Sequence, residues 1–109
     1  MSKHGTIEFS GKSGKLYSFN VYSLDTEFRP YSGVYCITRR SEGDNGHRIH
    51  EKLFISVTDD MSSGVLSKTP KSCFENHEAN CICTHREESA QARDEIQQDL
   101  VGRYNPPCN

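Results

Sequence analysis

The part of the chain that decides the fold is residues 33–58, which read GVYCITRRSEGDNGHRIHEKLFISVT. Both ends of this stretch are rich in β-branched and aromatic residues, the residue types that favour strands. Between them lies a polar loop over 41–46, which ends in Asn45-Gly46, a strong turn signal. The sequence therefore predicts two successive strands, over 33–39 and over 51–58.

Further elements are predicted on both sides of this stretch. Alternating apolar residues at 6–9 and 16–22, separated by turn residues at 11–14, predict an N-terminal hairpin. Downstream we expect a short helix that starts at Asp59 or Asp60 and runs to about Lys68. A helical turn or two within 72–79 and a fifth strand over 80–85 should follow.

The best helix is predicted over 87–104, where Ile96, Leu100 and Val101 form an apolar stripe. Ser89 is suited to cap its N-terminus, because a serine hydroxyl accepts a hydrogen bond from the first turn. The prolines at 106 and 107 end it, since proline disfavours helical geometry in the residue before it. Together these elements predict a single α+β domain over residues 1–109.

Composition limits the class of protein. With 109 residues, of which 33% are hydrophobic, the chain can bury only a modest core. The net charge of −2 argues against a dedicated nonspecific nucleic-acid binder, because such binders neutralise phosphates with excess positive charge. We expect no membrane span and no signal peptide. The five cysteines are then expected as free thiols in a reducing cytoplasm.

Four short motifs occur in a fixed order along the chain. They are Gly33-Val34-Tyr35, Phe54-Ile55-Ser56, Asp99-Leu100-Val101 and the terminal Pro106-Pro107-Cys108-Asn109. In order and spacing, the set resembles the GIY-YIG nuclease domain. The resemblance covers about residues 31–109. It implies a small antiparallel sheet that carries the first two motifs on adjacent strands, flanked by two to three helices. The hairpin within residues 1–30 would be an addition that widens the sheet.

The resemblance also implies a set of site positions. In the family, two tyrosines and an arginine activate water and steady the scissile phosphate, a glutamate binds one divalent metal ion, and an asparagine supports the site. Here the corresponding positions are Tyr35, Phe54, Gly64, Gln97 and Asn109.

Three of these five positions lack the group that the chemistry needs. Phe54 has no phenol with which to donate a hydrogen bond. Gly64 carries no charge, and the amide of Gln97 is a poor ligand for a hard cation such as Mg²⁺. A serine, Ser56, also replaces the glycine of the second motif. The sequence therefore suggests a degenerate nuclease site.

Nearby residues offer only partial substitutes. Lys68 lies four residues after Gly64 and would share its helix face, but it lacks the guanidinium fork. Glu95 and Asp99 each lie two residues from Gln97, so they should point away from it on the helix. No arginine occurs between positions 48 and 86, whichever register is chosen.

Basic side chains near the first two motifs are candidates for nucleic-acid binding. They are Arg39, Arg40, Lys52 and Lys68. A solvated charged face is the alternative interpretation of the same residues.

Several cysteines and histidines are candidate metal ligands. Cys81, Cys83 and His85 alternate on one predicted strand and should share a face. Cys73 and His77 have helical i, i+4 spacing. Zinc sites usually show closely paired cysteines, which are missing here, and cysteines on a strand face suit a core equally well. We therefore expect no metal and no cofactor.

Three functions fit these observations. The first is a catalytically impaired GIY-YIG-like domain that binds nucleic acid or a nucleic-acid-processing protein and regulates or inhibits it. The second is an active nuclease dependent on Mg²⁺ or Mn²⁺, with Tyr35, Asn109 and a shifted carboxylate such as Glu95. The third is a small oligomerising protein whose hairpin edge pairs with a partner strand.

Overall fold

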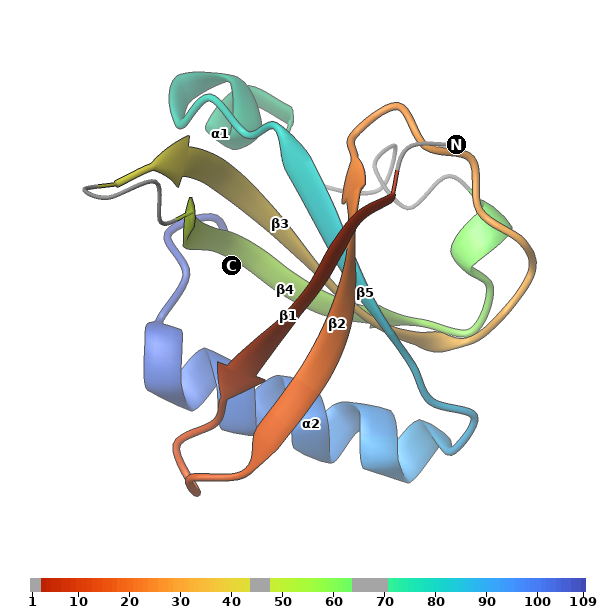
Figure 1. Cartoon of the computed structure of the whole chain (residues 1–109). Coiled ribbons are helices and arrows are strands. Elements are labelled where there is room, and N and C mark those ends of the chain that lie inside the picture. Colours follow the sequence, from red (N-terminus) through yellow and green to blue (C-terminus); the bar gives the residue numbers. More distant parts are fainter. Residues whose placement is uncertain (1–2, 44–47, 64–70) are drawn as a thin grey trace.

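The computed structural model describes residues 3–43, 48–63 and 71–109, in which five strands form one antiparallel sheet (Figure 1). The order across the sheet is β1-β2-β5-β3-β4. The N-terminal hairpin joins the rest of the sheet where β2 pairs with β5. The strands are β1 (Lys3–Ser10), β2 (Leu16–Ser23), β3 (Gly33–Glu42), β4 (Arg48–Thr58) and β5 (Cys81–Arg86).

The helices lie on opposite faces of this sheet. The long helix α2 (Ala90–Tyr104) runs across one face, and the short helix α1 (Lys71–Asn76) lies on the other side (Figure 1). A single 3-10 turn, η2 (Met61–Ser63), follows β4. This arrangement confirms the predicted α+β class with an antiparallel sheet and flanking helices.

Alternation along the strands divides the apolar residues between two clusters. On β3, Val34 and Cys36 point into the cluster under α2, whereas Tyr35 and Ile37 point into the cluster on the α1 side. The α2 cluster takes in the hairpin, with Phe9, Phe19 and Val21 buried. The hairpin therefore shares a core with the strands that carry the two motifs.

Helix α2 begins three residues later than predicted, although its cap is the predicted one. The hydroxyl of Ser89 accepts a hydrogen bond from the amide of Ala92 at 3.2 Å. Glu87 stays extended because its amide donates to the carbonyl of Ser32 at 3.0 Å. At the other end, Asn105 takes a left-handed conformation and donates to the carbonyl of Val101.

The short helix expected from Asp59 or Asp60 to about Lys68 lies only in part within the described residues. Residues 61–63 form η2, and Asp60 supports it by accepting hydrogen bonds from the amide and hydroxyl of Ser62. Residues 64–70, which include Gly64 and Lys68, lie outside the described part of the chain.

The prediction of free thiols is wrong for two of the five cysteines. Cys73 in α1 and Cys108 in the C-terminal tail form a disulfide across 35 residues of sequence. Such a pair becomes visible only when the fold brings α1 and the tail together. Cys36, Cys81 and Cys83 are free and buried. Among the helices in the described residues, none is long and apolar enough to span a membrane.

Candidate functional site

A cleft opens at the outer edge of β4, between the end of that strand and the start of α2. It has a volume of about 280 Å³. One tyrosine from β3, the last two residues of β4 with the residue that follows them, and three residues from α2 line it: Tyr35, Val57, Thr58, Asp59, Ala90, Arg93 and Asp94. The tyrosine of the first motif therefore lines a cleft that also holds one arginine and two acidic residues.

Tyr35 is almost fully buried at this cleft. It lies directly opposite Ser56 in the β3–β4 register. Burial raises the pKa of the Tyr35 phenol, and a hydrogen bond with the Ser56 side chain partly offsets that rise. The phenol therefore stays neutral at physiological pH, able to donate a hydrogen bond but not to act as a base.

Phe54 takes part in packing rather than chemistry. Its ring centroid lies 6.2 Å from that of Tyr35 and 5.7 Å from that of Phe74 in α1. It belongs to the apolar cluster on the α1 side. The second motif thus connects the cleft tyrosine to α1 through aromatic contacts.

Gln97 and Asn109 converge on one backbone residue of β4. The Gln97 amide donates to the carbonyl of Ile55 at 3.1 Å, and the Asn109 amide donates to the same oxygen at 2.8 Å. The Asn109 carbonyl accepts from the Ile55 amide at 2.8 Å. Both side chains thus support the backbone at the strand edge, and Asn109 uses its amide nitrogen and its amide oxygen to do so.

Arg93 is a site residue that the sequence analysis missed. It is 9% exposed, and one guanidinium nitrogen donates to the carbonyls of Glu87 and Glu88 at 3.1 and 3.0 Å. Its spacing in the sequence could have indicated that it is buried. Arg93 lies three residues before Ile96 and seven before Leu100, which places all three on the buried face of α2.

The sequence analysis also missed Asp94. The two carboxylates that it proposed as substitutes for the missing glutamate lie outside the cleft. Asp94 is three residues before Gln97 and lines the cleft. Glu95 and Asp99 instead line a groove against the hairpin. Asp99 accepts hydrogen bonds from the Ser13 hydroxyl and the Tyr17 hydroxyl, both at 2.7 Å.

The basic candidates already have partners in the structure. Arg39 forms an ion pair with Glu78 at 3.7 Å. The backbone of Arg40 forms two hydrogen bonds with the side chain of Asn80, and its side chain interacts with the Cys81 thiol, where it partly offsets the rise in the pKa of that thiol caused by burial. The ammonium group of Lys52 lies over the rings of Phe9 and Tyr104. The fourth candidate, Lys68, lies outside the described residues.

Lys52 packs between two rings rather than projecting into solvent. Its Nζ lies 4.9 Å from the ring centroid of Phe9 and 4.4 Å from that of Tyr104. Cation–π attraction of this kind holds the ammonium group against the α2 side of the sheet. A phosphate would have to compete with these contacts.

The cysteine and histidine candidates separate into two groups. Cys81 and Cys83 are buried in the α2 cluster, and burial raises the pKa of Cys83 to about 12. His85 turns its Nδ1 to the carbonyl of Ser18 at 2.8 Å. Cys73 and His77, in contrast, lie together with Cys108.

Comparisons with known proteins leave the family open. No protein-family model, no curated protein and no solved structure matches this chain.

Proposed function

We propose that this chain is a nuclease-like, GIY-YIG-like domain that no longer cleaves phosphodiesters and works as a binding module that regulates a nucleic-acid-processing protein. The observation that carries the proposal is the position of Gln97 and Asn109. Both side chains hold the backbone of Ile55. A metal-dependent nuclease of that family would need an anionic ligand where Gln97 instead supports the edge of β4.

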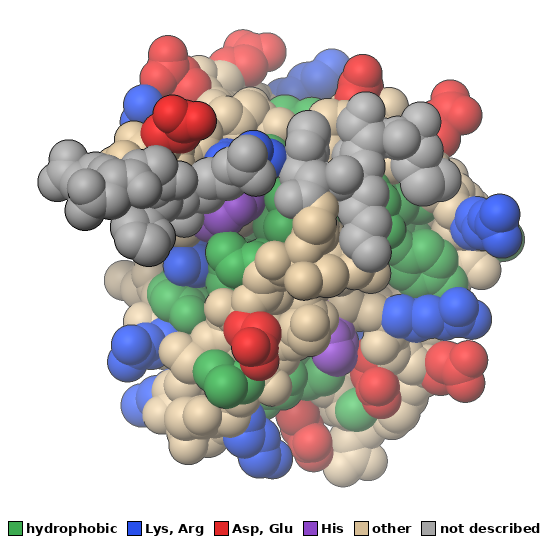
Figure 2. Space-filling model, viewed as in Figure 1, with side chains coloured by type: hydrophobic (Ala, Val, Ile, Leu, Met, Phe, Trp, Pro, Cys, Tyr) green, Lys and Arg blue, Asp and Glu red, His purple; other side chains and the backbone are tan. Residues whose placement is uncertain are grey.

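The charge distribution favours a protein partner over nucleic acid. Nucleic-acid affinity depends on cations that are free to neutralise phosphates. Arg39 is paired with Glu78, Lys52 lies over aromatic rings, and Arg86 lies over the ring of Tyr31. Figure 2 shows acidic and basic side chains interspersed around the visible face, rather than a basic patch.

An apolar pocket beside α1 offers a docking point for such a partner. It has a volume of about 230 Å³ and is lined by Leu24, Phe74 and Ala79, with charged residues around them: Lys71, Glu75 and Glu78. Apolar pockets with a few polar groups at the rim are typical of anchor sites in protein recognition. Because Glu78 is paired with Arg39, Glu75 is the acidic group that the rim offers, so the fitting partner segment has an apolar anchor residue next to a lysine or arginine.

One observation supports a second candidate function. The Thr58 hydroxyl is hydrogen-bonded to the backbone of Asp60, but the acidic residues Asp59 and Asp94 line the same cleft as Tyr35 and Arg93. Oxygen donors of this kind suit Mg²⁺ or Mn²⁺. When bound, such an ion would supply Lewis-acid stabilisation of a phosphate. Tyr35 could then orient a phosphate oxygen as a neutral donor, and Arg93 would contribute positive charge. This is a metal-dependent phosphodiesterase with a shifted carboxylate.

A plasmid-nicking assay separates the two functions. Purified chain is incubated with supercoiled plasmid in Mg²⁺ or Mn²⁺, beside an EDTA control. The binding module gives no nicking above that control. Cleavage that depends on metal and is lost in Tyr35→Phe and Asp94→Asn, but kept in Glu95→Gln, would replace the first proposal with the second. Glu95 is a matched control because it lies on the same helix and faces the hairpin groove.

The choice of partner class is tested by direct titration. Labelled single-stranded and double-stranded DNA and RNA are titrated with the chain at several salt concentrations. We expect no salt-dependent rise in anisotropy; a steep salt dependence would redirect the proposal to nucleic acid.

The docking point is tested by backbone amide NMR with short peptides that carry a leucine or phenylalanine beside a lysine. We expect chemical-shift changes only in the backbone amides of residues 71–79, and we expect Ala79→Glu to abolish them. Shifts that persist in Ala79→Glu would place docking elsewhere.

A further inference from the structure

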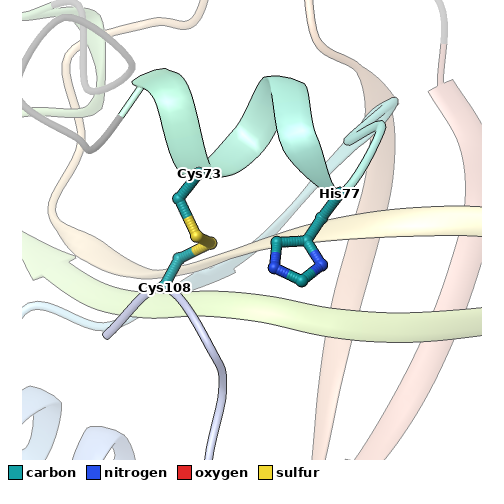
Figure 3. Close-up of side chains that lie close together, drawn as sticks. All are labelled: Cys73, His77 and Cys108. Atoms are coloured by element: carbon teal, nitrogen blue, oxygen red, sulfur yellow. A yellow bond between two sulfur atoms is a disulfide. The ribbon is translucent and has the colours of Figure 1, made fainter.

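Two cysteines and one histidine, none of which lines the β4 cleft, form a compact group of soft ligands. The sulfur atoms of Cys73 and Cys108 and a ring nitrogen of His77 all lie within 4.8 Å of one another. Figure 3 shows the imidazole of His77 beside the sulfur pair. Cys73 is on α1, and His77 comes directly after that helix, one turn beyond Cys73, with its amide donating to the carbonyl of Cys73 at 3.0 Å.

The two sulfurs are joined as a disulfide, which cannot bind a metal ion as thiolates do. Reduction of the disulfide would create two thiols next to one imidazole. We propose that Cys73, His77 and Cys108, once the disulfide is reduced, form a binding site for a thiophilic divalent cation, with Zn²⁺ as the expected ion. This inference does not depend on the function proposed for the chain.

The ligands should stay in place after reduction because other contacts anchor both sides. The amide of Cys108 donates to the carbonyl of Leu53 at 2.8 Å, and the next residue, Asn109, forms two hydrogen bonds with Ile55. On the other side, Phe74 holds α1 through its ring contact with Phe54. The disulfide is therefore not the only link between α1 and the tail.

The ligand set suits zinc in number and in chemistry. Thiolate and imidazole are the ligands that Zn²⁺ prefers, and two sulfurs with one nitrogen leave a fourth position for water or an added ligand. Among the residues that the structure describes, no histidine, cysteine or carboxylate joins these three as a fourth ligand. Cys73 and His77 are partly exposed, so an ion can enter from solvent.

The reaction balances with a dithiol or phosphine as the reductant. A dithiol transfers two electrons and two protons to the Cys73–Cys108 bond and becomes a disulfide itself. Both thiols then lose their protons as they bind one Zn²⁺, while His77 binds through a neutral ring nitrogen. Return to the Cys73–Cys108 disulfide needs a two-electron acceptor, such as a small-molecule disulfide that is itself reduced to two thiols, and it releases the ion. The pair therefore exchanges a covalent link for a metal link.

The other cysteines are poor competitors for the ion. Cys36, Cys81 and Cys83 are buried, and burial raises the pKa of each thiol, so each resists conversion to the thiolate. A reduced chain should therefore bind one equivalent of metal rather than several.

The test is a metal titration of the full chain in both redox states. The chain is reduced with a phosphine, freed of reductant under anaerobic conditions and titrated with Zn²⁺ by calorimetry. Co²⁺ is used in parallel, because its thiolate bonds give a charge-transfer absorption band. We expect one equivalent bound by the reduced chain and none by the oxidised chain. X-ray absorption at the zinc edge should show sulfur at about 2.3 Å.

Variants decide whether these three residues are the ligands. His77→Ala keeps both cysteines and should weaken zinc binding by more than about a hundredfold, since outer-shell changes alone cost 10–100-fold. His85→Gln, on β5, is the matched control and should bind as the wild type does. The Cys73→Ser/Cys108→Ser variant should show no charge-transfer band with Co²⁺.

The proposal is overturned if the reduced wild type binds no zinc, or if His77→Ala binds it as tightly as the wild type. It also fails if the double-serine variant still shows the cobalt–thiolate band, because the buried cysteines would then be the ligands. If that variant does not fold, as judged by circular dichroism, the comparison of His77→Ala with His85→Gln still decides the question.

Discussion

The side chain of Asn109 pairs with the backbone of Ile55 as a neighbouring strand would. Its oxygen accepts from the Ile55 amide, and its nitrogen donates to the Ile55 carbonyl, each at 2.8 Å. The amide of Cys108 adds a hydrogen bond to the carbonyl of Leu53. The tail thereby satisfies backbone groups that an edge strand would otherwise leave open.

Asn109→Ala should lower the free energy of unfolding by about 1–2 kcal/mol, because it removes two hydrogen bonds that each contribute about 1 kcal/mol net. Asn109→Asp keeps the acceptor but places an anion against the Ile55 carbonyl, so it should cost at least as much. Urea denaturation measures both variants. Asn76→Ala, an exposed asparagine at the end of α1, is the control. Equal stability of Asn109→Ala and wild type would show that the Asn109 side chain contributes nothing to the stability of the fold.

Gly33→Ala should destabilise the sheet by about 1–3 kcal/mol, the usual cost of overpacking. A Cβ at position 33 would overlap the backbone carbonyl of His85 on the neighbouring strand β5. Gly102→Ala is the contrasting change, because a Cβ there would lie 3.4 Å from Cδ of Lys12 and the position is helical. It should gain up to about 1 kcal/mol from helix propensity. Thermal melts of both variants test whether their melting temperatures change in opposite directions. A higher melting temperature for Gly33→Ala would refute the close approach of β3 and β5.

Asp99→Asn should reduce the loss of stability at acidic pH. Hydrogen bonds from Ser13 and Tyr17 lower the pKa of the Asp99 carboxyl in the folded chain. A carboxylate with a lowered pKa contributes stability above its unfolded value, about 3.9, and loses it as the pH falls through the folded value. The measurement is the free energy of unfolding from about pH 7 down to about pH 3. Glu8→Gln, on an exposed position of β1, is the control. If the free energy of unfolding falls equally with decreasing pH in Asp99→Asn and in the wild type, Asp99 does not have this role.

Arg93→Met should lower the free energy of unfolding by about 2–4 kcal/mol. The variant keeps most of the buried stem but removes two hydrogen bonds from a charged donor to carbonyls, each worth about 1.5–3 kcal/mol. Arg103→Met, an exposed position near the end of the same helix, should change stability by less than about 0.5 kcal/mol. Chemical denaturation compares the two. Similar effects from both variants would mean that Arg93 does not hold the segment before α2.

The sequence was sufficient to predict the class of fold and the presence of five strands, but β3 runs on to Glu42 and β4 starts at Arg48, so the predicted loop over 41–46 was too wide. Alternation of apolar residues identified both hairpin strands, and Ser89 was the correct cap for α2. These features depend on residues close together in the chain. The start of α2 was misplaced because Glu87 is held extended by Ser32, a contact across 55 residues.

The site was harder to predict because its contacts depend on how α2 lies against β4. An amide at position 97 suggests a lost metal ligand, and only the packed structure shows that it bonds the Ile55 carbonyl. Arg93 lies on the apolar face of α2. A charged residue there interrupts the apolar stripe in the sequence, so the sequence alone suggests that it is exposed. The Cys73–Cys108 pair likewise depends on the meeting of α1 with the tail.

The occupied edge of β4 has a consequence for self-association. A strand from a second molecule could hydrogen-bond along the middle of β4 only after displacing the tail at Leu53 and Ile55. At the opposite margin of the sheet, β1 has a register irregularity between Lys3 and Thr6 and a left-handed Gly5. Polymerisation by edge-to-edge addition requires two receptive margins on every molecule. With one margin blocked, such addition would stop at a pair and would not extend into a fibre.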